Sequence, residues 1–201
     1  ADPASWIEGR YSEGDHAVVL RSRVEGGAIT SDIFDGRGHS LTQLASATLD
    51  RKSMRTPDGK LVIPVQALVA NAVELRTAAR LSERGLRRLR ESIPTAADSQ
   101  MLARLSQQST QLGNAWTQTR LVLLQEWGSV ARRQIQMTPD EHTKFFDIFR
   151  RAATAIASKS PATMDSEIAV LLGPARYADY KTRRTAWLAS VPDSGAQDVV
   201  P

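Results

Sequence analysis

The chain has 201 residues, which is enough for one well-packed domain with a small additional element. Hydrophobic residues make up 41% of it and charged residues 24%, an ordinary globular composition that excludes collagen-like and fully disordered chains. The absence of cysteine excludes disulfides, thiol nucleophiles and thiolate metal sites, and 26 basic residues against 22 acidic ones leave only a small positive charge. The apolar runs are too short to cross a bilayer, so we expect no transmembrane segment.

The N-terminal segment has the features of a processed or added end. The sequence begins at Ala1 without an initiator Met, and residues 7–10 match a protease-cleavage linker. We therefore expect residues 1–15 to be a flexible N-terminus or the remnant of an added linker, outside the predicted fold. A processed end favours a periplasmic or secreted protein, and a cytoplasmic location stays open because a cysteine-free chain suits either compartment.

Residues 16–63 predict a small appendage that contains β-hairpins. Apolar segments flank the glycine pair at 26–27 and indicate a first hairpin over about 16–34, because glycine accepts the positive φ of tight turns. The loop 35–39 that follows contains two further glycines and a histidine. Its backbone amides could bind an anion, but a plain connector is the favoured interpretation.

Two local signals complete this appendage. Ser40 and Gln43 have the spacing of a helix capping box, which predicts a short helix as far as about Leu49. Residues 56–59 have the Thr-Pro-Asp-Gly sequence of a tight turn, which predicts a second small hairpin.

The strongest pattern in the chain begins at Pro64, which suits the first position of a helix. Apolar residues then recur at three- and four-residue steps as far as Ile93, interrupted only at Ser82, and predict a helix over 64–93 that Pro94 ends. A second long helix is expected over 96–135, and the two should pair as an antiparallel hairpin.

Arginines gather near the end of the first long helix, and they are the candidate partner-binding residues. Guanidinium groups can bind phosphates or an acidic protein surface, whereas the alternative is a solvated helix end whose cations complement the helix dipole. The cluster consists of Arg80, Arg84, Arg87, Arg88 and Arg90.

Further helices are expected over 139–158 and 162–189, the latter interrupted at Gly173. Thr138 and Glu141 form a capping box at the start of the first of them, and a disordered tail is expected over 191–201. The predicted fold is therefore mainly α, with a four-helix bundle-like domain over 64–190 and the small β-hairpin appendage.

No catalytic motif is present, which argues against an enzyme, and we expect no cofactor or metal. His142 lies beside Asp140 and Glu141, a combination that could hold a metal or act as an acid–base pair. A solvated first helical turn is the favoured interpretation. The tryptophans at 116, 127 and 187 are expected to pack in the core.

The C-terminal part of the chain resembles a known family. Residues 137–141, followed by Phe145 and Phe149, resemble the Leu-Thr-x-x-Gln helix start of the periplasmic Spy/CpxP-like group of bacterial stress proteins. Residues 171–180 are similar to a leucine-glycine-proline segment that continues into an arginine-tyrosine helix in small exported helical proteins of bacteria. The chain departs from the group at residues 137 and 141, where it has Met instead of Leu and Glu instead of Gln.

The resemblance implies a periplasmic, non-enzymatic helical protein that binds unfolded clients or a sensor partner through a concave surface, often as a dimer. The function predicted from the sequence is therefore an exported interaction protein of chaperone-like or stress-sensing type. The alternative is a nucleic-acid-binding protein that uses the arginine-rich helix end, and steep weakening by salt would distinguish it from binding through apolar surface.

Overall fold

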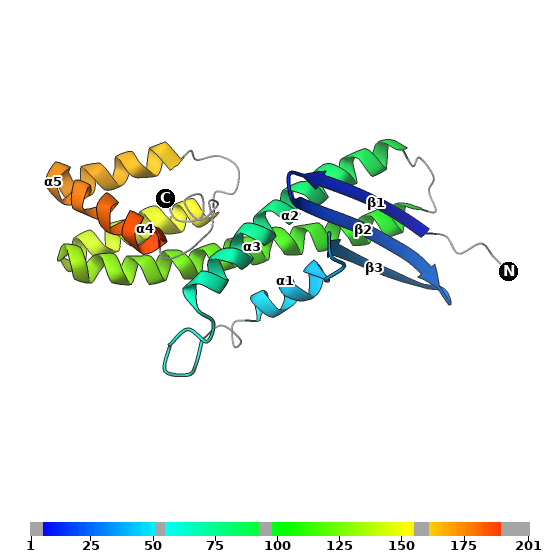
Figure 1. Ribbon diagram of the computed structural model, residues 1–201, viewed down its shortest axis with the longest axis horizontal. Coiled ribbons are helices and arrows are strands. Elements are labelled where there is room, and N and C mark those ends of the chain that lie inside the picture. Colours follow the sequence, from blue (N-terminus) through cyan, green and yellow to red (C-terminus); the bar gives the residue numbers. More distant parts are fainter. Residues whose placement is uncertain (1–5, 51–54, 93–97, 155–160, 190–201) are drawn as a thin grey trace. The chain divides into compact units, whose positions relative to one another are not determined.

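The computed structural model describes residues 6–50, 55–92, 98–154 and 161–189 (Figure 1). The described residues form three strands and five helices, which confirms the mainly helical class. Their contacts divide the chain into two compact units. Unit 1 comprises residues 1–54 and 74–116, and unit 2 comprises residues 55–73 and 117–201.

Unit 1 contains an antiparallel sheet in the order β1-β2-β3 (Figure 1). The strands are β1 (Trp6–Glu13), β2 (His16–Glu25) and β3 (Ala28–Asp35). Gly26 and Gly27 connect β2 to β3 with φ values of 57° and 81°, a conformation that side-chain-bearing residues rarely adopt. The predicted first hairpin is therefore confirmed.

Strand β1 corrects the expectation that residues 1–15 lie outside the fold. Residues 6–13 pair with β2 along the whole strand, from Trp6 opposite Arg23 to Glu13 opposite His16. Ile7 is buried and Tyr11 is half-buried on the same face, which is the period-two pattern of a strand with one covered side. The linker-like residues 7–10 are thus part of the sheet.

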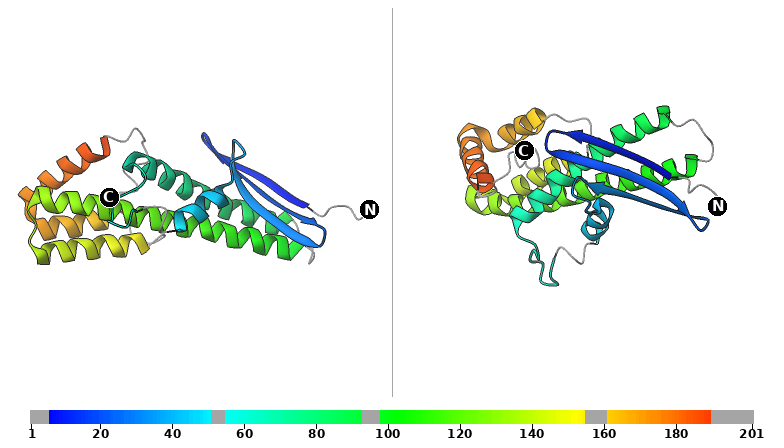
Figure 2. Two further views of the ribbon diagram at one scale, coloured as in Figure 1. Left: turned by 90° about the horizontal axis from the view of Figure 1, so that it is seen from below. Right: turned by 45° about the vertical axis from the view of Figure 1, so that its right-hand side comes forward.

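The sheet packs in unit 1 and is not an appendage. Its buried side chains lie on one face and include Val18, Leu20 and Ile33. Helix α1 (Leu41–Leu49) contacts β3, and the Ser40 side chain accepts a hydrogen bond from the Gln43 amide at 3.1 Å, as the capping box predicted. One apolar face of a sheet must be covered, and helices of the same unit cover it (Figure 2).

The two long helices are α2 (Val65–Ser92) and α3 (Ser99–Ile135), close to the predicted ranges. Pro94 and the predicted end of the first helix lie outside the described residues. Ser82, which interrupts the apolar pattern, is fully buried, and its hydroxyl bonds that of Ser109 on α3 at 2.6 Å. A polar pair with satisfied hydrogen bonds therefore replaces an apolar contact at this point.

The unit boundaries differ from the predicted division at residue 63. They fall within α2 and α3, so that residues 74–92 and 99–116 belong with the sheet, and the helices are divided between two units. Periodicity identifies the buried face of a helix but not the element that covers it. Of the predicted second hairpin, the described residues from position 55 onward show one bridge, between Arg55 and Leu61.

Unit 2 contains α4 (Pro139–Thr154) and α5 (Pro161–Ala189). The predicted interruption is present, because Gly173 has φ 74° and ψ 166° before Pro174. An aromatic core holds this unit together, in which Trp127 donates from its indole nitrogen to the Tyr180 hydroxyl at 3.2 Å. Trp187 lies against Trp127 with ring centroids 5.4 Å apart, and Trp116 is buried in unit 1.

Among the described helices, none has a stretch long and apolar enough to cross a membrane. The end of the helix predicted over 139–158 and the tail predicted over 191–201 lie outside the described residues.

Candidate functional site

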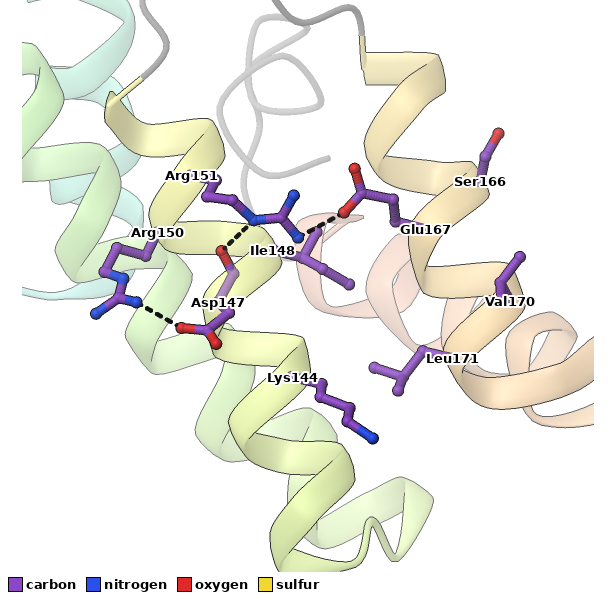
Figure 3. A pocket seen from close by; sticks show the side chains of 9 residues that line it. All are labelled: Lys144, Asp147, Ile148, Arg150, Arg151, Ser166, Glu167, Val170 and Leu171. Atoms are coloured by element: carbon purple, nitrogen blue, oxygen red, sulfur yellow. Dashed lines mark hydrogen bonds and ion pairs between the residues drawn. The ribbon is translucent and has the colours of Figure 1, made fainter.

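An open groove between α4 and α5 is the main candidate site in unit 2 (Figure 3). Its volume is about 650 Å³. Ile148 of α4 and Leu171 of α5 point into it, and Val170 is 86% exposed at its edge. The remaining lining residues are Lys144, Asp147, Arg150, Arg151, Ser166 and Glu167.

The charged groups around the groove form ion pairs with one another or with adjacent residues. Arg151 of α4 donates to Glu167 of α5 at 2.7 Å, which joins the two helices across the groove (Figure 3). Arg150 pairs with Asp147, and Lys144 pairs with Asp140, both at 2.7 Å. The groove therefore offers apolar surface within a polar rim whose charges are largely paired.

The capping box that starts α4 also positions α5. The Thr138 amide donates to Glu141 at 3.0 Å, and the Glu141 amide donates to the Thr138 hydroxyl at 3.2 Å. Arg176 of α5 donates to both carboxylate oxygens of Glu141, at 2.5 and 3.0 Å. The hydrogen bonds from Arg176 lower the pKa of Glu141 to about 2, with a further contribution from the Thr138 amide.

His142 does not interact with the neighbouring carboxylates of Asp140 and Glu141. Asp140 pairs with Lys144 and Glu141 with Arg176, while the imidazole lies edge-on to Phe146 with centroids 4.7 Å apart. Among the described residues, the buried Nε2 atom has no hydrogen-bond partner, and burial lowers the pKa of His142, with a further contribution from Arg132. The described residues contain no group of three or more His, Asp or Glu side chains that could hold a metal ion.

The predicted arginine cluster lies on the exposed side of α2 in unit 1, but part of it is already paired. Glu13 of β1 accepts from Arg80 at 3.0 Å and lies 3.4 Å from Arg84. Arg90 donates to the Ser106 hydroxyl at 3.2 Å. Arg87 and Arg88 are exposed, and they make no ion pair with the described residues.

The glycine-rich loop 35–39 closes on itself. Asp35 accepts hydrogen bonds from the amides of Arg37 at 2.9 Å and His39 at 2.8 Å. These amides would otherwise be the donors for a bound anion, and they lower the pKa of Asp35 although its partial burial acts in the opposite direction. The loop is thus internally satisfied, in keeping with a connector.

Sequence patterns missed two features. Glu74 of α2 is half-buried, and burial raises the pKa of its carboxyl group, with a further contribution from Asp35. The spacing of residues along α2 cannot indicate that Glu74 lies near Asp35, which is distant in the sequence. The groove was also missed. The available signal was Val170, an apolar residue that lies outside the apolar stripe of its helix and is exposed in the structure.

Comparison of this chain with known proteins gives no match to a family model, and neither a curated protein nor a solved structure matches it.

Proposed function

We propose that this protein is a non-enzymatic interaction protein that binds apolar segments of unfolded client chains, in a chaperone-like or stress-response role. The observation that supports this proposal best is the groove between α4 and α5, where Leu171 and the exposed Val170 present aliphatic surface to solvent and the buried Ile148 completes the apolar lining.

The geometry suits an unfolded client better than a small substrate. The groove is open, and its ion pairs leave no concentrated charge that would select a small ionic ligand. Aliphatic side chains of an extended segment can fill such a groove with little regard for sequence, because burial of apolar area is not directional. A bundle-like arrangement of α4, α5 and the second part of α3 would provide the scaffold.

A light-scattering assay of reduced insulin tests the proposal. The full chain is expected to slow aggregation, and Val170→Asp is expected to lose most of this effect because it places a charge on the apolar surface. Val62→Asp is the matched control, since Val62 is 56% exposed in the same unit but does not line the groove.

Equal suppression of aggregation by the wild-type chain and by Val170→Asp would show that the groove is not the client-binding site. If the wild-type chain does not suppress aggregation at all, the proposed client-binding function is wrong.

A nucleic-acid-binding function is the second candidate, and the exposed Arg87 and Arg88 favour it. Binding of a single-stranded oligonucleotide through these residues would weaken steeply with salt, because phosphate contacts release counterions. Client binding through apolar surface would not. Arg87→Ala together with Arg88→Ala should abolish the first kind of binding and leave the second unchanged.

An exported, periplasmic or secreted location belongs to the same proposal. Fractionation of cells that express the complete open reading frame tests it, and recovery of the protein only in the cytoplasm would contradict it.

A further inference from the structure

The two outer edges of the sheet in unit 1 differ in how they are covered. At β3, the Gln108 side chain donates to the Ser31 carbonyl, and the Ile33 amide lies 3.4 Å from the Thr42 hydroxyl of α1. Phe34 also forms a bridge with Ser40. Side chains and a neighbouring segment thus satisfy part of this edge.

At β1 the outer edge is open. Among the described residues, the backbone groups of β1 hydrogen-bond only to β2. A two-residue turn at Gly14 and Asp15 closes the β1–β2 hairpin, so its closing pair, Glu13 and His16, exchanges backbone hydrogen bonds. The alternation along an antiparallel pair then directs outward the N–H and C=O groups of Trp6, Glu8, Arg10 and Ser12.

We propose that a second copy of this chain pairs antiparallel with the open edge of β1, about a two-fold axis at Gly9. In this register Glu8 lies opposite Arg10 of the other copy, and Arg10 lies opposite Glu8. The outward backbone groups of both residues then bond across the axis. The two sheets become one continuous sheet with an isologous interface.

The charges of β1 match this register. Opposite charges that face each other directly stabilise a strand pair, whereas like charges destabilise it. Glu8 already accepts from Arg21 of β2 at 2.6 Å on the outer face of the sheet. Arg10 lies on the same face and makes no ion pair with the described residues, so the second copy supplies the carboxylate that it lacks.

The apolar residues support the same pairing. In this register Ile7 of one copy lies opposite Tyr11 of the other, on the covered face of the sheet, so the apolar layer continues across the axis. Gly9 lies at the axis, where two strands approach most closely in a pair that does not share hydrogen bonds. The Tyr11 ring occupies the space of a side chain there, since a Cβ at Gly9 would lie 2.7 Å from its hydroxyl.

Trp6 is 63% exposed on the outer face of the same strand. The proposed register places it opposite Ser12 of the second copy and diagonal to Arg10, within reach of a long side chain. This contact would cover part of a large aromatic group that the single chain leaves in water.

Sedimentation equilibrium of the full chain measures the association directly, against a monomer mass of 22.0 kDa. We expect a concentration-dependent dimer. Glu8→Lys and Arg10→Glu should each be monomeric, because like charges then face each other twice across the axis. A mixture of the two variants should form a heterodimer, since each altered residue then faces an opposite charge.

Two further variants separate edge pairing from folding. Ser12→Pro removes an outward N–H without removing a bond to β2, so it should abolish the dimer while the circular dichroism spectrum is retained. Arg104→Glu, an equal charge change at an exposed position on α3, should leave the dimer intact. A monomeric wild-type chain at every concentration overturns the proposal, as does a mixture of Glu8→Lys and Arg10→Glu that stays monomeric.

The association and the client-binding function can fail separately. The dimer uses β1 of unit 1, and the groove lies between α4 and α5 of unit 2. Sedimentation reports only the first, and suppression of insulin aggregation by a folded Ser12→Pro monomer reports the second.

Discussion

The ring of Tyr11 on β1 lies directly against the backbone of Gly85 on α2. A Cβ atom added at Gly85 would overlap three atoms of this ring, including Cγ at 3.0 Å. The contact involves the part of the ring nearest the backbone, so a small rotation of the side chain cannot relieve it. Gly85 therefore allows the strand and the helix to approach each other closely.

Gly85→Ala should destabilise unit 1. Alanine is the better helix former, but the added methyl group forces β1 away from α2, and overpacking of this kind costs about 1–3 kcal/mol. Gly113→Ala is the matched control because a Cβ at that position on α3 meets no atom within 4 Å. It should stabilise the protein by up to about 1 kcal/mol. Urea unfolding followed by circular dichroism measures both, and equal shifts would contradict the packing argument.

The helices could be predicted closely because their signals are local. Capping residues such as Ser40 and Thr138, and the break at Gly173, act through backbone groups within a few positions along the chain. The assignment of helices to units could not be predicted in the same way. An apolar stripe on α2 can pack against another helix or against a sheet equally well. The contact between Gly85 and Tyr11 can therefore be identified only from the structure.

The candidate sites illustrate the same limit. The arginines of α2 follow from their spacing along one helix, but Glu13, which pairs with Arg80 and Arg84, lies in a segment that the predicted fold left out. The groove depends on which residues of α4 and α5 face each other. Arg151 and Glu167 are separated by the undescribed residues 155–160, and nothing in their local sequence indicates that they pair.

A second prediction concerns the buried hydrogen bond from Trp127 to Tyr180 in unit 2. Tyr180→Phe keeps the ring but leaves the indole N–H without its acceptor, which should cost about 1–3 kcal/mol of unfolding free energy. Tyr177→Phe, on the half-exposed neighbouring ring, should change it much less. Urea unfolding monitored by tryptophan fluorescence compares the two variants, and equal losses would contradict the role of the buried hydrogen bond.

The same burial predicts an alkaline effect, because it raises the pKa of Tyr180 to about 12. Unfolded chains ionise tyrosine near pH 10, so they release this proton first. The stability associated with neutral Tyr180 is present below about pH 10 and is lost as the pH rises through about 12. Absorbance at 295 nm measures the titration, and Tyr180→Phe should lack the late component.

The fourth prediction concerns acid stability and the pairing of Glu141 with Arg176. The folded carboxyl group has a pKa of about 2, while an unfolded glutamate titrates near 4.3. The unfolded chain therefore binds the proton first as the pH falls, and the stabilisation by Glu141 is complete above the unfolded value and is lost as the pH falls through about 2. Glu141→Gln should lower the thermal midpoint at pH 6, with a difference from the wild-type protein that shrinks below pH 4.

The geometry of the pair provides a control for this prediction. Arg176→Lys keeps the charge but cannot donate to both carboxylate oxygens, so it should fall between the wild-type protein and Glu141→Gln at pH 6. Because the side chain of Arg176 is 41% exposed, added salt should weaken the effect of both variants. A difference between Glu141→Gln and the wild-type protein that persists unchanged at pH 2 would mean that packing, and not the ionised carboxylate, connects α4 to α5.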